Sequence, residues 1–295
     1  MASLSDWPHA SLTLLAGPSA LVVITAGMLA LAPAKTGTVS ESLAVSAPQT
    51  VVIEPRAYSY RAPGEYSRDG YAVDAPLRTI EVARPLTIMK YQVSRGDYAR
   101  CVQAGVCPSP EPEFTAAVED ADMPATGISF DDANIYAKWL SDRTGDAWRL
   151  PTDAQLAFAA GARFPDDAIS TVSSNPAERW LEKYRREIAS SAGRDPVPKP
   201  RGHFGENEFG LADFGGNVWE WTTTCYRRVA ENEVARTEAL PCGVRFVAGR
   251  HRAAMVSFIR NPKGGACAVG APPENLGFRL VKDTRWYTSL LRLMR

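Results

Sequence analysis

The sequence predicts a loop-rich domain that contains both short helices and strands, and two observations lead to that prediction. The 295 residues include 22 glycines and 22 prolines, which favours a loop-rich domain over a helical bundle. Short segments with helix-capping residues stand between stretches that carry the apolar pattern of strands. Basic and acidic residues both number 33, so no positive excess suggests a nucleic-acid partner.

The first recognisable element is an uncharged apolar segment at 12–34, which follows a tail at 1–11. It is long enough to cross a bilayer, and we expect an uncleaved transmembrane helix that anchors the chain to the membrane. A cleaved signal peptide is the alternative, because Ala32–Ala34 has the small-x-small form of a cleavage site. Either interpretation places the remainder on the periplasmic, extracytoplasmic side of the membrane, anchored by a single pass or secreted.

The next elements are extended. Residues 35–50 are small and polar and are expected to form a linker, and an apolar strand follows at Val51–Ile53. Residues 54–76 are rich in Pro, Gly, Tyr and Arg, so we expect them to be irregular. Loose alternation over Thr79–Met89 predicts strands.

Three helices are then predicted from their first residues. Each begins with a Ser or Thr three positions before an acidic or amide residue, which is the capping-box pattern. The second helix carries an apolar stripe and ends before Gly145, a typical C-terminal glycine, and the third is an alanine-rich helix over 153–163. The three capping pairs are Ser94 with Asp97, Ser129 with Asp132, and Thr152 with Gln155.

The remaining chain has a weaker pattern. Residues 164–200 contain one amphipathic piece around Trp180, Leu181 and Tyr184. Leu276–Val281 is expected to be a buried closing strand, which ends the domain at 51–283. The tail at 284–295 is basic and apolar, and is either a packed terminus or a surface helix that touches the membrane.

Five cysteines agree with export, because an oxidising compartment preserves disulfides. The preferred pairs are Cys101–Cys107 and Cys225–Cys242, which leaves Cys267 unpaired, although spacing alone does not settle connectivity. The chain has only three histidines and no CxxC pair, which disfavours a zinc or non-haem iron site.

The segment Gly215–Thr222, GGNVWEWT, combines a glycine turn with two tryptophans on either side of Glu220. Such alternation predicts a half-buried strand with Glu220 on the face opposite both rings. Two interpretations of Glu220 are open: a solvated side chain on a core strand, or a ligand for a hard cation, which binds carboxylates together with main-chain carbonyls.

Several motifs in order resemble those of the formylglycine-generating enzyme, or sulfatase-modifying factor, family. They are GISFDDANIYAKWLS, WRLPTDAQLAFAAGAR, GENEFGLADFGGNVWEWT and NLGFRLV, preceded by Tyr91–Ser94, and the likeness runs from about residue 46 to 283. The resemblance implies a single compact α+β domain with a C-type-lectin-like fold. It also implies a structural Ca²⁺ site formed by the side chains of Asp213 and Glu220 and the carbonyls of Gly216 and Val218.

The chain departs from the family where the chemistry resides. Family enzymes bind copper(I) through two cysteines five apart, shortly before NLGFR, and the corresponding segment Gly249–Arg260 contains none. Copper is therefore not expected. His251 and Cys267 are the candidate catalytic residues, as an acid/base and a thiol. The candidate substrate-binding residues, which suit a carboxylate or phosphate, are Arg250, Arg252 and Arg260. The alternative is a satisfied polar His251 beside solvated arginines.

Three functions follow from these observations. The preferred one is an exported, membrane-anchored accessory or maturation factor that acts on an exported client protein or a small-molecule substrate, without copper-dependent formylglycine synthesis. The second is an oxidase with a rebuilt site that uses Cys267 and His251. The third is a lectin-like binding module without catalysis, so whether the protein is an enzyme stays open at this point.

Overall fold

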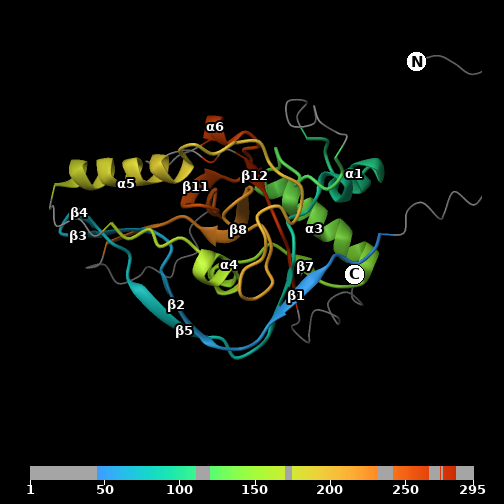
Figure 1. The fold of residues 1–295 in the computed structure, drawn as a ribbon, viewed down its shortest axis with the longest axis horizontal. Helices are drawn as coiled ribbons and strands as arrows, with labels where there is room; N and C mark the ends of the chain where they lie inside the picture. Colours follow the sequence, from blue (N-terminus) through green and yellow to red (C-terminus); the bar gives the residue numbers. More distant parts are fainter. Residues whose placement is uncertain are drawn as a thin grey trace, which may run out of the picture. The chain divides into compact units, whose positions relative to one another are not determined.

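Two four-stranded sheets form the centre of the fold in a computed structural model of the chain (Figure 1). The structure describes residues 45–110, 120–169, 175–230, 242–265, 273 and 275–283, all within one unit, Leu43–Arg295. The expected anchor at 12–34, the tails at 1–11 and 284–295, and most of the 35–50 linker lie outside the described residues. Within the described ranges, no helix has the length and hydropathy needed to span a bilayer.

The first sheet joins residues from both ends of the domain, in the order β1-β6-β13-β7. Strand β6 (Leu86–Met89) pairs antiparallel with β1 (Thr50–Ile53) and β13 (Val281–Lys282), and β13 pairs with β7 (Trp148–Arg149). The strands expected at 51–53 and within 79–89 are therefore confirmed.

The second sheet has the order β11-β10-β8-β12. Strands β11 (Arg252–Val256) and β8 (Trp219–Cys225) are both antiparallel to β10 (Val244–Ala248), and β12 (Leu276–Gly277) is parallel to β8. The single closing strand expected over 276–281 was wrong, because the chain crosses from one sheet to the other there. The Phe278 and Leu280 carbonyls accept hydrogen bonds from the Val93 and Met89 amides during this crossing.

Two smaller sheets correct the expectation of irregular chain over 54–76. Strand β2 (Ala57–Arg61) pairs with β5 (Leu77–Glu81), and β3 (Glu65–Arg68) lies between β4 (Tyr71–Val73) and β9 (Arg228–Ala230). The parallel β3–β9 pair joins residues far apart in the sequence, so local composition did not reveal it. A two-residue alternation of Tyr58 and Tyr60 in β2 was the available signal.

All three predicted helix starts are confirmed. Complete capping boxes begin α1 (Arg95–Gln103), α3 (Phe130–Thr144) and α4 (Asp153–Ala160), and α3 ends at Gly145 in the left-handed conformation. The third helix is shorter than expected, because residues Gly161–Arg163 form the 3₁₀ helix η2. Helix α6 (Pro262–Gly265) follows β11.

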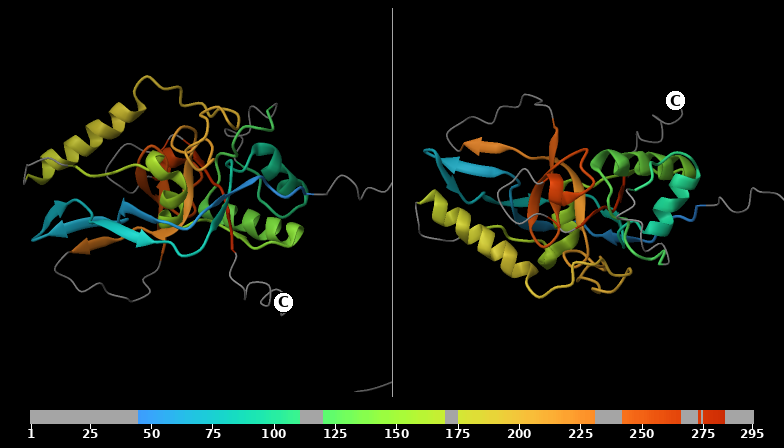
Figure 2. Two further views of the ribbon diagram at one scale, coloured as in Figure 1. Left: turned by 60° about the horizontal axis from the view of Figure 1, so that its bottom comes forward. Right: turned by 90° about the horizontal axis from the view of Figure 1, so that it is seen from above.

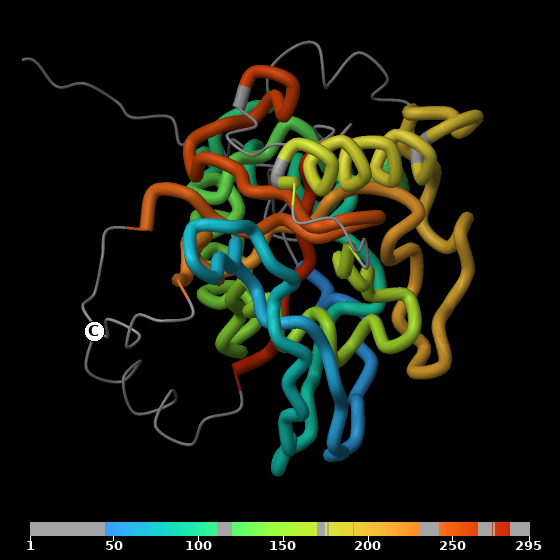
Figure 3. Tube along the Cα trace, turned by 90° about the vertical axis from the view of Figure 1, so that its left-hand side faces the viewer, coloured from blue at the N-terminus to red at the C-terminus, as the bar shows by residue number. Residues whose placement is uncertain are grey.

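Helix α5 (Pro176–Ser191) lies on the same side of the fold as the β3–β4 hairpin, and contacts β4 (Figures 1 and 2). Viewed from that side, the yellow helix lies in front of the orange-red strands and above the cyan hairpin (Figure 3). Two buried clusters beneath them combine the sheets with α3 and α4. Because α5 contributes no residue to either cluster, its position depends on other contacts.

Candidate functional site

A pocket of about 410 Å³ lies between α5, the β3–β4 hairpin and the β10–β11 strands. Four of its lining side chains are aromatic and come from separate parts of the chain: Tyr66, Trp180, Tyr226 and Phe246. A concave, mainly apolar surface of this size with a few convergent polar groups is typical of a ligand site.

The floor of this pocket is formed by β10 and β11. Phe246 and Ala254 are cross-strand partners and both line the pocket, so a large ring stands beside a small side chain. The Tyr226 ring packs against Phe246 with centroids 5.6 Å apart. The small size of Ala254 leaves the space beside the ring open.

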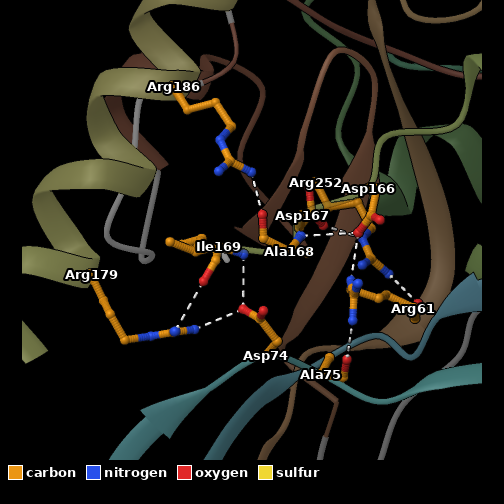
Figure 4. Close-up of polar contacts among 10 residues, drawn as sticks. All are labelled: Arg61, Asp74, Ala75, Asp166, Asp167, Ala168, Ile169, Arg179, Arg186 and Arg252. Atoms are coloured by element: carbon orange, nitrogen blue, oxygen red, sulfur yellow. Dashed lines mark hydrogen bonds and ion pairs between the residues drawn. The ribbon is translucent and has the colours of Figure 1, made fainter. Parts of the chain in front are cut away.

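Ion pairs and hydrogen bonds hold the loop at 166–169 in place. The loop contacts Arg179 of α5 and Arg61 of β2 (Figure 4). Asp74 accepts hydrogen bonds from Arg179 at 2.7 Å and from the Ile169 amide at 2.8 Å, and Arg179 also donates to the Ile169 carbonyl. Arg61 pairs with Asp166 at 2.5 Å. Polar contacts therefore hold α5 over the pocket.

Arg252, a predicted substrate-binding residue, lines this pocket and is buried. Its Nε donates to Asp167 at 2.5 Å, and its Nη1 donates to Asp153 at 3.2 Å and to the Arg61 carbonyl at 3.1 Å. Burial lowers the pKa of Arg252, but Asp167 and Asp153 outweigh that effect and raise it, so the side chain remains a cation. Arg252 thus connects the pocket loop to the first turn of α4.

Asp153 is fully buried at the first position of α4. Burial raises its pKa to about 6, although the attraction of Arg252 opposes this shift. Its Oδ1 atom has no hydrogen-bond partner among the described residues. A carboxyl group in such surroundings holds its proton to a higher pH than an exposed aspartic acid does.

Among the described residues, the other candidates His251, Arg250 and Arg260 do not line this pocket. His251 is buried, with its ring 5.3 Å from the Trp219 ring, and the Arg250 guanidinium stands over the same tryptophan. Cys267 lies outside the described residues, and a joint catalytic role of Cys267 and His251 stays a prediction.

Arg260 binds Asp132 through two hydrogen bonds, at 2.7 and 2.9 Å. Burial acts to raise the pKa of Asp132, but hydrogen bonds from Arg260 and Ser129 outweigh it and hold the pKa below its usual value. Because Asp132 also completes the capping box of α3, this arginine stabilises a helix start. A substrate role for Arg260 stays a prediction.

The carboxylates of the expected calcium site have other partners. Glu220 is fully buried, which excludes the solvated interpretation, and accepts hydrogen bonds from Arg279 at 2.5 and 2.7 Å and from Gln92 at 2.7 Å. The two carboxylate oxygens of Asp213 accept hydrogen bonds from the Gly202 and Phe204 amides.

In this arrangement the two carboxylates do not fit a calcium ion, because Arg279 already balances the charge of Glu220 and a divalent cation would have to displace it. Calcium coordination by Asp213, Gly216, Val218 and Glu220 stays a prediction that these contacts do not favour. The sequence did not identify Arg279 as the partner, since it lies 59 positions away.

Both expected disulfides are present in the described part of the chain. Cys101–Cys107 links the end of α1 to the following turn, and Cys225–Cys242 links the end of β8 to a position two residues before β10. The second bond brings together the strands that lead to the pocket floor.

The comparisons with known proteins agree with the fold. A family model described as sulfatase-modifying factor enzyme 1-like domain matches residues 35–284. The solved structure of PvdO from Pseudomonas aeruginosa has a TM-score of 0.54 and 20% identity, covering 80% of this chain and 94% of that one.

Two curated relatives carry formylglycine-generating names. Inactive C-alpha-formylglycine-generating enzyme 2 of Bos taurus is 26% identical over 164 residues, 55% of this chain and 50% of that protein. Formylglycine-generating enzyme of Mycobacterium tuberculosis is 35% identical over 112 residues, 35% of this chain and 34% of that protein. The chain thus spans about half the length, or less, of these relatives. With most of its length matched by the family model, the chain belongs to the sulfatase-modifying factor family.

Proposed function

We propose that the protein is an exported, membrane-anchored accessory or maturation factor that binds an exported client or a small-molecule substrate, without copper(I) chemistry. The pocket between α5, the β3–β4 hairpin and β10–β11 is the binding site in this proposal. It supplies a ligand-sized surface, and the ion pairs around Arg252 give it a fixed shape.

One observation carries the loss of copper chemistry: the segment Gly249–Arg260 contains no cysteine, and strand β11 occupies it. Ala253, Ala254 and Met255 of this strand are buried. Copper(I) is a soft ion that prefers thiolate ligands, and a single remaining thiol, Cys267, does not make a two-thiolate site. The relative named as an inactive formylglycine-generating enzyme supports a family member without that chemistry.

Export is supported by the two disulfides, because such bonds persist in oxidising compartments. We assign the membrane attachment to the apolar segment at 12–34 and the domain to the periplasmic side. A cleaved leader would release the same domain in soluble form.

Removing the protein from its source organism tests the role. Mass spectra of the exported proteins and metabolites, compared with and without the chain, should show an unprocessed client or substrate. The chain itself and its Cys267→Ser variant should both restore processing. A loss of formylglycine in the client, or a failure of Cys267→Ser to restore it, would contradict the proposal and favour the oxidase.

A further inference from the structure

We infer that the pocket binds one uncharged aromatic ring, presented by a side chain of an extended peptide or carried by a free small molecule. The inference rests on the proposed function, because it names what the same site binds. Three properties of the lining support it: the source of its aromatic residues, the pairing of its charges, and the exposed ring that α5 adds to it.

The aromatic lining comes from several elements that converge on one space. Tyr66 lies on β3, Tyr226 follows β8, Phe246 lies on β10, and Trp180 lies on α5. Tyr66 and Phe246 are buried, while Ala254 leaves room beside Phe246. Aromatic pairs in offset or edge-to-face contact contribute about 0.5–1.5 kcal/mol beyond the area that they bury. A ring in this space is therefore favoured over an alkyl group of equal size.

The charges along the lining favour an uncharged ligand. Every charged side chain among the described residues that line the pocket has an ion-pair partner: Asp74 with Arg179, Asp167 with Arg252, Arg61 with Asp166, Glu65 with Arg228, and Lys183 with Glu187. A charged ligand would lose water without gaining a free counter-charge, or would have to break one of these pairs.

The same side chains favour a π-system. Among the described lining residues, cations outnumber anions by five to three, because two anionic partners, Asp166 and Glu187, lie outside the lining. Guanidinium and ammonium groups attract the negative face of an aromatic ring without needing a charge on the ligand.

Helix α5 carries two exposed rings, one of which, Trp180, lines the pocket. Trp180 stacks on Tyr184, with centroids 5.5 Å apart and planes 2° from parallel, and both rings are more than one-third exposed. The exposed Trp180 ring therefore adds a solvent-facing aromatic surface to the lining of the pocket.

Ligand-observed NMR with the full chain tests this assignment through matched probes. N-acetyl-tryptophanamide should bind more tightly than its anionic analogue N-acetyl-tryptophan and its cationic analogue tryptamine. N-acetyl-phenylalaninamide should exceed N-acetyl-cyclohexylalaninamide by about two- to tenfold, the factor that an aromatic pair supplies. A capped Gly-Gly-Trp-Gly-Gly peptide that binds more tightly than the single amide identifies a peptide source, and equal or weaker binding identifies a free ring.

Two variants locate the binding. Ala72→Trp fills the pocket from an exposed position of β4, and should weaken N-acetyl-tryptophanamide at least about tenfold without lowering the melting temperature. Thr79→Trp adds the same ring at an exposed position of β5 outside the pocket lining, and should leave the affinity for N-acetyl-tryptophanamide unchanged. Equal binding of charged or cyclohexyl probes, or unchanged binding in Ala72→Trp, overturns the inference. If the probes fail in this way while the deletion strain still accumulates unprocessed client, the inference about the ligand is wrong and the proposed function is retained.

Discussion

At the scale of single residues, the buried ion pair between Glu220 and Arg279 connects the two central sheets. Arg279 donates to Glu220 and also to the carbonyls of Lys90 and Ala212, and neither member of the pair is exposed. Removing one member of a buried pair leaves the other charge without compensation in a low dielectric, which is more costly than losing a surface pair.

Glu220→Gln should therefore lower the free energy of unfolding by about 3–5 kcal/mol, measured by urea denaturation. Because Arg279 and Gln92 hold both oxygens of Glu220, we expect the same loss in calcium and in chelator. Replacing both partners, as Glu220→Gln with Arg279→Met, should cost less than the sum of the single changes. A loss confined to the calcium-containing buffer would instead establish Glu220 as a calcium ligand.

Asp153 gives the protein a defined pH response. Its folded-state pKa, raised to about 6 by burial, exceeds the unfolded value of 3.8, so the folded protein holds the proton more tightly. The contribution of this bound proton to the free energy of unfolding is complete below the unfolded pKa and is lost as pH rises through about 6. In Asp153→Asn, the change in the free energy of unfolding between pH 4 and 7 should therefore be smaller than in the parent chain by roughly 1–3 kcal/mol.

Urea denaturation of the parent chain and Asp153→Asn at several pH values measures that difference. Glu208→Gln is a matched control, since this carboxylate is largely solvated and its pKa is lowered by backbone hydrogen bonds, chiefly from Ala162. Parallel curves for the parent and Asp153→Asn across this range would contradict a raised pKa at Asp153.

At the scale of elements, the sequence was sufficient to predict those helix starts that depend on residues close together in the chain. Ser94, Ser129 and Thr152 each begin a helix because the capping box satisfies backbone groups within three residues. The β3–β9 pair and the crossing between β12 and β13 depend on partners far along the chain. Neither periodicity nor composition contains that information, so these elements and the pocket that they enclose were not predicted.

Helix α5 was foreseen only as an amphipathic piece, because its apolar residues do not enter the core. Arg179 links the helix to the rest of the fold through Asp74 and the Ile169 carbonyl, and Arg186 donates to the Ala168 carbonyl. We expect Arg179→Ala to speed amide hydrogen exchange in α5 about fivefold, the effect of losing about 1 kcal/mol of local stability. Global stability should barely change.

Mass-spectrometric hydrogen exchange resolves this effect by segment. Arg185→Ala on the same helix is the matched control, because Arg185 is exposed and has no hydrogen bond or ion pair with any described residue. Equal exchange rates in α5 for the two variants would show that Arg179 does not hold the helix in place.

At the scale of the whole molecule, the order of motifs was enough to predict the family and its compact domain, and the two disulfides preferred from the positions of the cysteines are confirmed. The function was harder to predict from the sequence, because the residues of the candidate site lie far apart along the chain. Arg252 was recognised as a candidate, but its partners Asp153 and Asp167 lie 99 and 85 positions away. Only the fold reveals that the three residues form one charged connection beside a pocket.

The disulfides make a prediction for the intact chain. Alkylation of the denatured, unreduced protein should modify one cysteine, Cys267, because the other four are paired. Replacing Cys225 and Cys242 by Ala should lower stability by about 3 kcal/mol through the freed loop of 17 positions. Mass spectrometry counts the modified thiols, and a count of three or five would contradict this pairing.

The most direct measurement is a copper(I) titration of the reduced full chain against a competing chelator, with oxygen uptake recorded for a cysteine-containing peptide. Since Gly249–Arg260 has no thiol, we predict no stoichiometric copper binding that survives the chelator, and no oxygen uptake above the protein-free rate. One tightly bound copper per chain that disappears in Cys267→Ser, together with oxygen consumption, would contradict the proposed function and establish a rebuilt oxidase site.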